Sequence, residues 1–373
     1  MTRVVIWVQH LLGTGHTVRA GAIAHALAAA GAEVTLVLGA RPPATLDVAG
    51  LDLVELTPVA ATDPSFRTII GEDGTPYAAL QAARRARFAE TIAAKRPDAI
   101  LVEAFPFGRG PFEGEIVPVL EALDRRVFVA SSIRDVLVRK SPQKERVMTA
   151  RARAHFDRIY VHADPAFVRL EDSFAAAGEV ADLIDYTGFV HRPATAPAAP
   201  GGDGSDEVIV SAGGGAVGGA LVEAALGAAA LGPSRWRILV SPKMGEGRIA
   251  AWRAAAPENA VVEPNRPDFG ALLARSALSV SQAGYNTVLD VLAAGTRAIF
   301  VPFAANEETE QTDRAEALAR RGLARVLAEN GLTAPMLAEA VDAALAEARP
   351  GPQPIDTKGA ETTAARLLAE AGR

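Results

Sequence analysis

The feature that most constrains the fold is a pattern that occurs twice in the chain: a short apolar strand, a glycine loop, a helix and a second strand. In the first copy, residues 4–8 form an apolar run rich in β-branched side chains, and a loop with Gly13 and Gly15 follows. A helix is expected over 17–30 and a strand over 34–38. Such a β-loop-α-β unit predicts a parallel α/β sheet.

The second copy begins after residues 191–206, a stretch of Pro, Ala and Gly with nothing to pack, which is typical of an interdomain linker. We therefore predict an N-terminal Rossmann-like domain over 1–190 and a C-terminal one over 207–373, with parallel sheets facing a cleft. Strands are expected at 99–102, 127–130, 158–162, 208–211, 236–240, 260–262, 278–281 and 298–301, and helices around 78–95 and 114–123.

Composition narrows the function. The 373 residues are 49% hydrophobic, enough for two cores, and the absence of cysteine excludes a disulfide framework, a thiolate zinc site and a cysteine nucleophile. A net charge of −6 argues against a nucleic-acid partner. The N-terminus does not read as a signal peptide, and no apolar run reaches the ~18 residues that span a bilayer. We expect a soluble, cytoplasmic protein.

The first glycine loop, residues 13–21 (GTGHTVRAG), does not have the dinucleotide fingerprint, because Val18 stands where a third glycine is needed. It instead carries His16 and Arg19 at the start of a helix. The positive helix end disfavours the protonated imidazole, so a neutral His16 could accept a proton from a hydroxyl. A histidine that only caps or packs is the alternative. Arg19 could hold an anion or pair with an acid.

The second glycine loop, residues 211–218 (SAGGGAVG), lies between a predicted strand and a predicted helix. The amides of Gly213, Gly214 and Gly215, together with the helix N-terminus, form an anion site that suits a diphosphate. The loop does not end in Gly-Lys-Ser/Thr, so hydrolysis of ATP or GTP is not indicated. Glycines that only shape a tight turn are the alternative.

Residues 278–323 gather small and polar groups at two strand ends. A turn at Gly284 opens a helix that carries Thr287 and Asp290, and a later helix carries Gln311. Asp290 can accept two hydrogen bonds from a ribose diol; a solvent-facing helix acid is the alternative.

These residues resemble the C-terminal domain of the MurG family, the bacterial transferases that add N-acetylglucosamine to lipid-linked muramyl-pentapeptide. The segment 278–323 has the family's glycine turn, threonine, acid, Val-Pro strand end and Gln-rich stretch. Residues 211–218 resemble the family's second glycine motif and residues 13–16 its first. The resemblance implies a GT-B fold and inverting, metal-independent transfer from a UDP-sugar.

By the same resemblance, Asp290 binds the ribose, the 213–215 loop binds the diphosphate, and Glu310 and Gln311 face the donor sugar. Position 290 is aspartate where the family commonly has glutamate, and Glu310 replaces a usual glutamine, which leaves the donor sugar open. The predicted nucleotide-sugar site comprises Gly13, Gly15, Ser211, Gly213, Gly214, Gly215, Gly284, Asn286, Thr287, Asp290, Glu310 and Gln311.

The N-terminal half looks unlike MurG over 105–123 and 131–140 and is similar to a less characterised group of predicted bacterial glycosyltransferases. Its acceptor is therefore not inferred from MurG. Glu103 follows a predicted strand and is the alternative to His16 as general base. The predicted acceptor-binding residues are Arg19, Phe105, Phe107 and Arg109. The basic stretch 134–158 could contact anionic lipid at the inner face of the membrane, or form a solvated helix face.

The sequence thus predicts transfer of a sugar from a UDP-sugar to a hydroxyl acceptor, lipid-linked or polysaccharide. No metal is expected, since no Asp-x-Asp pair is present, and no cofactor besides the UDP-sugar co-substrate. Two alternatives stay open. Residues 13–19 also resemble the UDP-sugar hydrolase of pseudaminic acid biosynthesis, and a catalytically silent nucleotide-sugar-binding protein would have the same loops.

Overall fold

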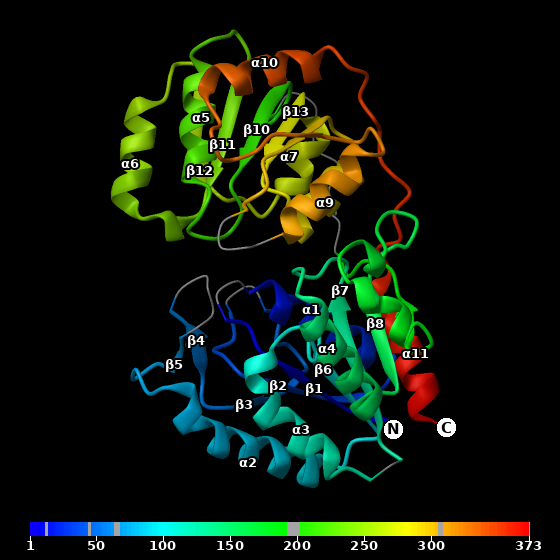
Figure 1. Ribbon diagram of the computed structural model, residues 1–373. Helices are drawn as coiled ribbons and strands as arrows, with labels where there is room; N and C mark the ends of the chain where they lie inside the picture. Colours follow the sequence, from blue (N-terminus) through cyan, green and yellow to red (C-terminus); the bar gives the residue numbers. More distant parts are fainter. Residues whose placement is uncertain are drawn as a thin grey trace. The chain divides into compact units, whose positions relative to one another are not determined.

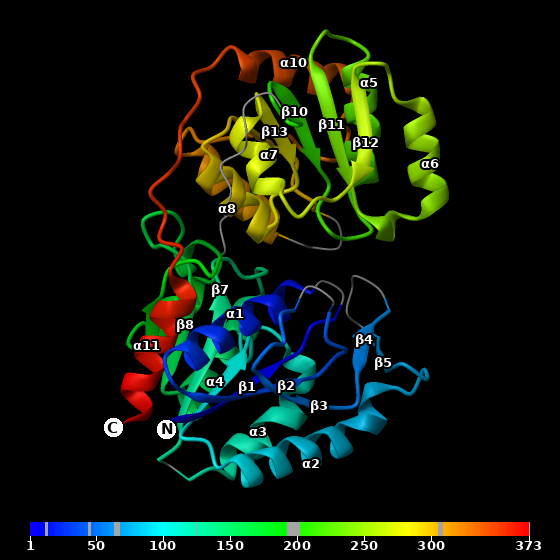
Figure 2. The same cartoon turned by 180° about the vertical axis from the view of Figure 1, so that it is seen from behind.

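The computed structural model describes residues 1–11, 14–43, 46–62, 68–124, 126–191, 202–304 and 309–372. The chain divides into two compact units (Figures 1 and 2). Unit 1 comprises Met1–His191 together with Asp356–Arg373, and unit 2 comprises Arg192–Ile355. Each unit is built around its own parallel sheet, so the two Rossmann-like halves expected from the repeated pattern are confirmed.

The sheet of unit 1 has the order β3-β2-β1-β6-β7-β8-β9, and every neighbouring pair is parallel. Its strands are β1 (Arg3–Val8), β2 (Glu33–Leu38), β3 (Asp52–Glu55), β6 (Ala99–Glu103), β7 (Phe128–Arg134), β8 (Arg158–His162) and β9 (Ile184–Tyr186). A separate antiparallel pair is formed by β4 (Val59–Ala61) and β5 (Ile69–Gly71). The helices are α1 (Gly15–Ala29), α2 (Tyr77–Lys95), α3 (Glu113–Glu121), α4 (Pro142–His155) and α11 (Gly359–Ala371), with short 3-10 turns at η1 (Gly110–Phe112), η2 (Leu170–Asp172) and η3 (Ala175–Val180).

Both faces of this sheet are covered, which explains why β1 is a continuous apolar run rather than an alternating one. Val4 and Ile6 belong to the cluster of buried side chains that includes α1 and α11. Val5 and Trp7 point the other way, into the cluster that includes α2 and α3. Figures 1 and 2 show α2 beside α3 and α1 beside α11.

The sheet of unit 2 has the order β12-β11-β10-β13-β14-β15 and is also parallel throughout. Its strands are β10 (Glu207–Ser211), β11 (Arg235–Val240), β12 (Ala260–Pro264), β13 (Leu278–Ser281), β14 (Ala298–Phe300) and β15 (Arg325–Val326). The helices are α5 (Gly219–Ala229), α6 (Glu246–Ala255), α7 (Phe269–Arg275), α8 (Tyr285–Ala294), α9 (Glu310–Ala319) and α10 (Ala334–Leu345), with a 3-10 turn at η4 (Pro242–Met244).

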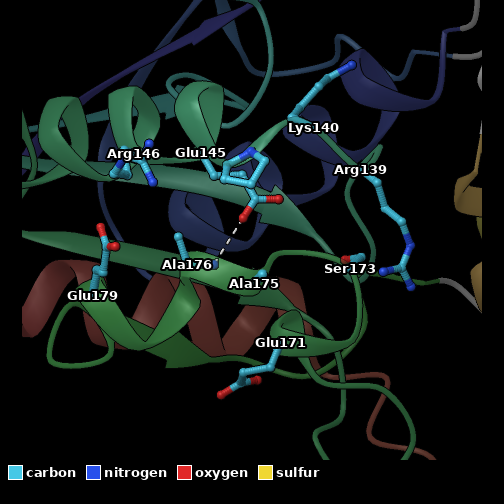
Figure 3. Close-up of a pocket in the computed structure, with 10 residues that line it drawn as sticks. Arg139, Lys140, Glu145, Arg146, Glu171, Ser173, Ala175, Ala176 and Glu179 are labelled. Carbon is cyan, nitrogen blue, oxygen red and sulfur yellow. Dashed lines mark hydrogen bonds between the residues drawn. The ribbon is translucent and has the colours of Figure 1, made fainter.

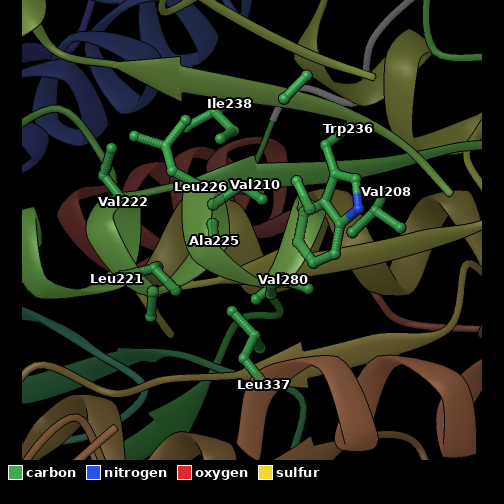
Figure 4. Close-up of a cluster of buried hydrophobic side chains, with 14 of the residues drawn as sticks. Val208, Val210, Leu221, Val222, Ala225, Leu226, Trp236, Ile238, Val280 and Leu337 are labelled. Atoms are coloured by element: carbon green, nitrogen blue, oxygen red, sulfur yellow. The ribbon is translucent and has the colours of Figure 1, made fainter. Parts of the chain in front are cut away.

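The largest core cluster of unit 2 joins the sheet to α5, α6 and α10. Figure 4 shows Val208 and Val210 of β10 among side chains from α5, such as Leu221, and Leu337 from α10. Alanines on α5 bring this helix close to the sheet and to α10. The alanine richness of the chain here serves helix packing.

The strands predicted from apolar runs are all present, with ends that differ by a few residues at most. The predicted helices correspond to α1, α2 and α3. The sequence did not indicate β3, β4, β5, β9 or β15. These strands have two to four residues, and β3 is a partly exposed edge strand with an acid at each end, so none has a buried apolar run to reveal it.

The predicted C-terminal domain, 207–373, extends too far. The chain returns to unit 1 at Asp356, whose carbonyl accepts a hydrogen bond from the N–H of Phe189 at 2.7 Å, and Gly359 donates to the carbonyl of Phe189 at 3.0 Å. On α11, Leu367 is fully buried against the α1 side of the sheet. An amphipathic helix at the end of a chain gives no sequence signal for which of two similar domains it covers.

The predicted linker, 191–206, lies partly outside the described residues, but its last part is anchored to unit 2. Asp203 pairs with Arg237 at 3.0 Å and with Arg266 at 2.7 Å. Arg237 in turn contacts Glu207 at 2.7 Å, at the first residue of β10. The prediction that the whole stretch has nothing to pack is therefore wrong for Asp203, because its charge partners are far away in sequence.

Candidate functional site

In unit 1, a histidine, a glutamate and an arginine meet at the carboxyl end of the sheet. His16 is the second residue of α1, and Glu103 is the last residue of β6, the strand that pairs with β1. The His16 Nδ1 lies 2.7 Å from the Glu103 Oε1, and Arg19 Nη2 donates to the same oxygen. Glu103 and Arg19 are 1% and 6% exposed, whereas His16 keeps 17%.

Burial sets the protonation states of this cluster. Burial lowers the pKa of His16 to about 3, against the opposing effect of the Glu103 carboxylate, and Arg109 and Arg134 lower it further. Burial alone would raise the pKa of Glu103, but His16, Arg19 and Arg109 hold that pKa well below its usual range. A neutral ring beside an ionised carboxylate donates through Nδ1–H, so Nε2 is the nitrogen that can take a proton.

The predicted acceptor residues have different surroundings from those expected. Phe105 is fully buried and Phe107 is 5% exposed; they pack against Phe156 and Phe174 at centroid distances of 6.2 Å and 5.4 Å. Both are core residues. Arg19 is an internal counter-ion of Glu103 rather than an open anion site.

Other predicted residues of unit 1 are placed as follows. Arg109 is half-buried, has a left-handed backbone with φ of 59°, and donates through Nε to the carbonyl of Gln9 at 2.6 Å. Its charge acts on His16 and Glu103, so it belongs to the same cluster. Gly15 is the first residue of α1. Its φ is not positive, and a Cβ at this position would meet nothing within 4 Å. Gly13 lies outside the described residues.

A second charged cluster, which the sequence did not reveal, lies within unit 1. Arg84 of α2 and Glu115 of α3 are both fully buried, 2.6 Å apart. Arg84 also donates to the carbonyls of Gly39 and Thr57 and to Gln9 Oε1. One guanidinium thus connects the segments that follow β1, β2 and β3. These segments begin at the carboxyl ends of their strands, the same end of the sheet at which His16 and Glu103 lie.

In unit 2, the predicted diphosphate loop connects β10 to α5. Gly213 and Gly218 have φ of 74° and 90°, which L side chains rarely adopt. A Cβ on Gly218 would also lie 2.7 Å from Ala212 Cβ. Glycine is therefore required at these two positions by the shape of the loop itself.

Four consecutive amides of this loop have no acceptor in the described part of the chain. Gly213 N–H donates to Ser211 Oγ at 3.4 Å, but within the described residues the N–H groups of Gly214, Gly215, Ala216 and Val217 have no protein acceptor. The first N–H groups of α5 add to this row, since a helix leaves them unpaired at its start. Such a row attracts an anion.

The segment that carries Asp290 lies next to this loop. β10 pairs with β13, with Ser211 opposite Ser281, and Gln282 N–H donates to the carbonyl of Ser211 at 3.1 Å. Gly284 caps α8, on which Asn286 is exposed and Thr287 and Asp290 are half-buried. The two predicted donor-site segments are therefore neighbours; which ligand atoms these side chains bind stays a prediction.

The Gln-rich stretch is tied to the same edge of the sheet. Gln311 Oε1 accepts a hydrogen bond from the N–H of Phe303 at 3.1 Å, and Glu310, the first residue of α9, is 6% exposed. Arg314 is 4% exposed and donates to the carbonyl of Ala283 at 2.8 Å. α9 thereby fixes the turn before α8, and the predicted contacts of Glu310 and Gln311 with a donor sugar stay predictions.

Three further side chains at this edge were missed by sequence reasoning: Ser241, Asn265 and Gln282. Each directly follows a strand, respectively β11, β12 and β13, and each contacts the glycine loop or the space inside it. The usable signal was their position, since polar residues just after parallel strands meet at one edge.

Part of the basic stretch 134–158 is neutralised within unit 1. Arg151, Arg153 and Arg158 pair with Glu113, Asp182 and Glu370. A cavity of about 340 Å³ is lined by the residues just before α4, the first turn of α4 and the η2–η3 segment. Figure 3 shows the side chains that line it. Its charged lining is balanced, with Arg139, Lys140 and Arg146 against Glu145, Glu171 and Glu179. Membrane contact through this stretch stays a prediction.

Two features of the described ranges bear on membranes and metal ions. Across those ranges, no helix combines the length and apolarity that a bilayer crossing needs. Nor do three or more His, Asp or Glu side chains converge there as metal ligands would.

The C-terminal half of the chain is similar to known glycosyltransferases. Residues 220–369 match the glycosyltransferase family 28 C-terminal domain. A curated relative is the UDP-N-acetylglucosamine--N-acetylmuramyl-(pentapeptide) pyrophosphoryl-undecaprenol N-acetylglucosamine transferase of Cupriavidus pinatubonensis (strain JMP 134 / LMG 1197), 36% identical over 133 residues. That match covers 34% of this chain and 37% of the relative, so it spans little more than a third of the relative's length.

Solved structures resemble the whole chain. The calicheamicin glycosyltransferase CalG4 has a TM-score of 0.65 at 17% identity, covering 100% of this chain and 95% of that one. MurG of Acinetobacter baumannii has a TM-score of 0.61 at 18% identity, covering 98% and 99%. The chain therefore has the GT-B fold, and the resemblance to MurG and to family 28 in its C-terminal half is confirmed.

Proposed function

We propose that this chain is an inverting, metal-independent glycosyltransferase that moves a sugar from a UDP-sugar to a hydroxyl acceptor. The family 28 match over 220–369 supports this class of activity. One structural observation carries the proposal: the row of N–H groups from Gly214 to Val217, without protein acceptors in the described part of the chain, stands beside the start of α5 and the segment that bears Asp290.

In this proposal unit 2 binds the donor. The loop amides and the N-terminus of α5 donate to the diphosphate, and Asp290 accepts from the ribose hydroxyls. As the sugar leaves, negative charge grows on the terminal phosphate, and amides that already point at that charge lower the barrier. Metal independence is proposed because these donors supply the stabilisation that a cation would otherwise give.

His16 is the proposed general base. Its Nδ1–H donates to Glu103, and Nε2 takes the proton of the acceptor hydroxyl while the oxygen attacks the anomeric carbon. The bond between that carbon and the diphosphate oxygen breaks, the electron pair leaves with UDP, and one displacement inverts the configuration. Glu103 is too buried to meet an acceptor, so its role is to hold the ring and its tautomer.

The identity of donor and acceptor rests on the relatives. The curated relative's name states a UDP-N-acetylglucosamine donor and a lipid-linked acceptor. We propose a UDP-linked donor for this chain and a hydroxyl acceptor that is lipid-linked or a polysaccharide, with action at the inner face of the membrane, in the cytoplasm.

Calorimetry with UDP tests the donor site first. The unsubstituted protein should bind UDP, and Asp290→Ala should weaken binding without lowering Tm, because Asp290 is half-buried on α8 rather than in the core. Asp313→Ala, an acid in the first turn of α9, is the matched control. No UDP binding by the unsubstituted protein would refute the donor site.

Turnover tests the chemistry. UDP-N-acetylglucosamine is incubated with lipid-linked and polysaccharide acceptors, with and without EDTA. UDP release should require an acceptor, persist in EDTA and fall by about 10²- to 10⁴-fold in His16→Ala, the usual contribution of a general base. Release of free sugar without acceptor would instead identify a hydrolase, and UDP binding without any turnover would identify a binding protein.

A further inference from the structure

Two carbonyls of the glycine loop are held by side chains from outside the loop. Asn265 Nδ2 donates to the carbonyl of Gly213 at 2.9 Å, and Ser241 Oγ donates to the carbonyl of Gly214 at 3.1 Å. Both side chains are placed by the sheet, because Ser241 directly follows β11 and Asn265 follows β12, where its own N–H bonds to the carbonyl of Val240 at 3.0 Å.

These two bonds determine where the loop's amides point. In a trans peptide the C=O and the following N–H point in opposite directions. Holding the carbonyls of Gly213 and Gly214 toward Asn265 and Ser241 therefore turns the N–H groups of Gly214 and Gly215 away from them. Peptide planes between glycines rotate easily because no Cβ restrains them, so without such anchors this orientation would be one of several.

A buried amide inside the loop indicates that a ligand belongs there. Gln282 is 4% exposed, and its Nε2 has no hydrogen-bond partner within the described residues. Its Oε1 lies 3.5 Å from the position of a Cβ on Gly213 and its Nε2 lies 2.9 Å from that of a Cβ on Gly218. An unsatisfied buried donor costs free energy, which an acceptor in the loop would recover.

We propose that Ser241 and Asn265 are positioning residues that set the loop's amides for a pyrophosphate group before any ligand binds. Their hydrogen bonds fix two peptide planes, so the N–H groups of Gly214 and Gly215 need no reorganisation when the anion arrives. The inference rests on the proposed function, because it assigns the diphosphate of the donor to this loop.

Asn265 offers the cleaner test because it is exposed and its side chain makes only the bond to Gly213 among the described residues. Calorimetry and competition binding are run with UDP, inorganic pyrophosphate and uridine. Asn265→Ala should weaken the binding of UDP and of pyrophosphate by about 5- to 10-fold, the usual effect of one hydrogen bond, and leave the affinity for uridine unchanged. Asn265→Asp should lose more affinity for UDP and pyrophosphate, since its carboxylate would face the Gly213 carbonyl without a proton to donate.

Controls separate positioning from folding. Asn330→Ala, at another exposed asparagine of unit 2, should bind all three probes as the unsubstituted protein does. Ser241→Ala should give the same probe pattern as Asn265→Ala, with a lower Tm because Ser241 Oγ also caps η4 through the N–H of Lys243. In Ser241→Thr the hydroxyl should restore pyrophosphate binding.

The outcomes distinguish this inference from the proposed function. Equal UDP and pyrophosphate affinities in Asn265→Ala and the unsubstituted protein would overturn the positioning role and leave the donor site intact. Equal losses for uridine and pyrophosphate would also overturn it, because a general distortion would then be the cause. If the unsubstituted protein bound pyrophosphate but not UDP, the proposed function would fail while a pyrophosphate loss in Asn265→Ala still supported the anchors.

Discussion

The two units place different chemistry at the carboxyl ends of similar parallel sheets. In unit 1 the strand-end segments are organised by buried charges: the Arg84–Glu115 pair and the cluster of His16, Arg19 and Glu103. In unit 2 the glycine loop is organised by neutral donors, Ser241 and Asn265. Buried charges can set the protonation state of a base, whereas neutral amides can receive an anion without a competing internal partner.

The distribution of histidine follows the same division. All six histidines of the chain lie between His10 and His191, and residues 192–355 contain none. Unit 1 therefore holds every side chain whose ordinary pKa lies near neutrality, and unit 2 binds or releases no proton through histidine. This difference between the two units can be tested by measuring stability, catalysis and the pH dependence of stability.

The largest expected effect is on the stability of unit 1. Glu115→Ala leaves the Arg84 charge buried without its partner, which should lower the free energy of unfolding by about 3 to 5 kcal/mol. Urea unfolding, monitored by hydrogen exchange that is resolved for each unit, measures this change in the free energy of unfolding. Asp182→Ala removes the partner of Arg153 in an exposed pair and should cost less than about 1 kcal/mol. Equal costs for the two variants would contradict the role of the buried pair.

The next effect is on catalysis. Glu103→Gln keeps the shape but removes the charge that orients His16, so kcat should fall by about 10²-fold, near the lower end of a general base's contribution. UDP affinity should not change, because the proposed donor site lies in unit 2. Glu121→Gln, at the exposed end of α3, is the control. A raised KM for donor at constant kcat would show that Glu103 serves binding instead.

A third effect is a pH dependence confined to unit 1. Burial lowers the pKa of His162 to about 3, and its ring nitrogens contact Ser132 at 2.7 Å and Thr187 at 2.9 Å. Below pH ~6.5 the unfolded chain binds a proton at His162, whereas the folded chain does not bind it until the pH nears the folded pKa. The free energy of unfolding therefore decreases as the pH is lowered.

The expected slope for His162 is up to about 1.4 kcal/mol per pH unit between pH ~6.5 and ~4.5, above the range where carboxylates titrate. Hydrogen exchange resolved by unit should show this loss in unit 1 and a flat response in unit 2. His162→Gln should reduce the slope. Parallel losses in both units would show that histidine burial is not the cause.

The sequence predicted what depends on neighbouring residues and missed what depends on distant ones. Strands such as β1 and β10 were found because both of their faces are buried and their apolar runs are continuous. The proximity of His16 and Glu103 was foreseeable, since His16 lies in the segment after one strand and Glu103 lies at the end of another strand of the same sheet. The burial of Phe105 and Phe107 was not, because it depends on Phe156 and Phe174, which are about 50 or more residues away. The anchors of the glycine loop were missed for the same reason: Asn265 and Gly213 are 52 positions apart.

The smallest effect separates shape from binding within the loop of unit 2. Gly218 has φ of 90° and no room for a Cβ, so Gly218→Ala should destabilise the fold by about 1 to 3 kcal/mol. Gly214 has neither restriction: its φ is not positive and a Cβ there would meet nothing within 4 Å. Gly214→Ala should therefore leave Tm unchanged or slightly raised, because alanine narrows the unfolded ensemble.

UDP affinity should nevertheless fall about 10-fold or more in Gly214→Ala, because a methyl group would occupy the space in which the backbone approaches the diphosphate in the proposed site. Thermal unfolding and calorimetry on the two variants give the comparison. If replacing a glycine leaves Tm unchanged but weakens UDP binding, that glycine serves binding. If the replacement lowers Tm first, the glycine serves the shape of the loop. If Gly214→Ala bound UDP normally, the diphosphate would lie away from this loop, and unit 2 would lose the feature that sets it apart from unit 1.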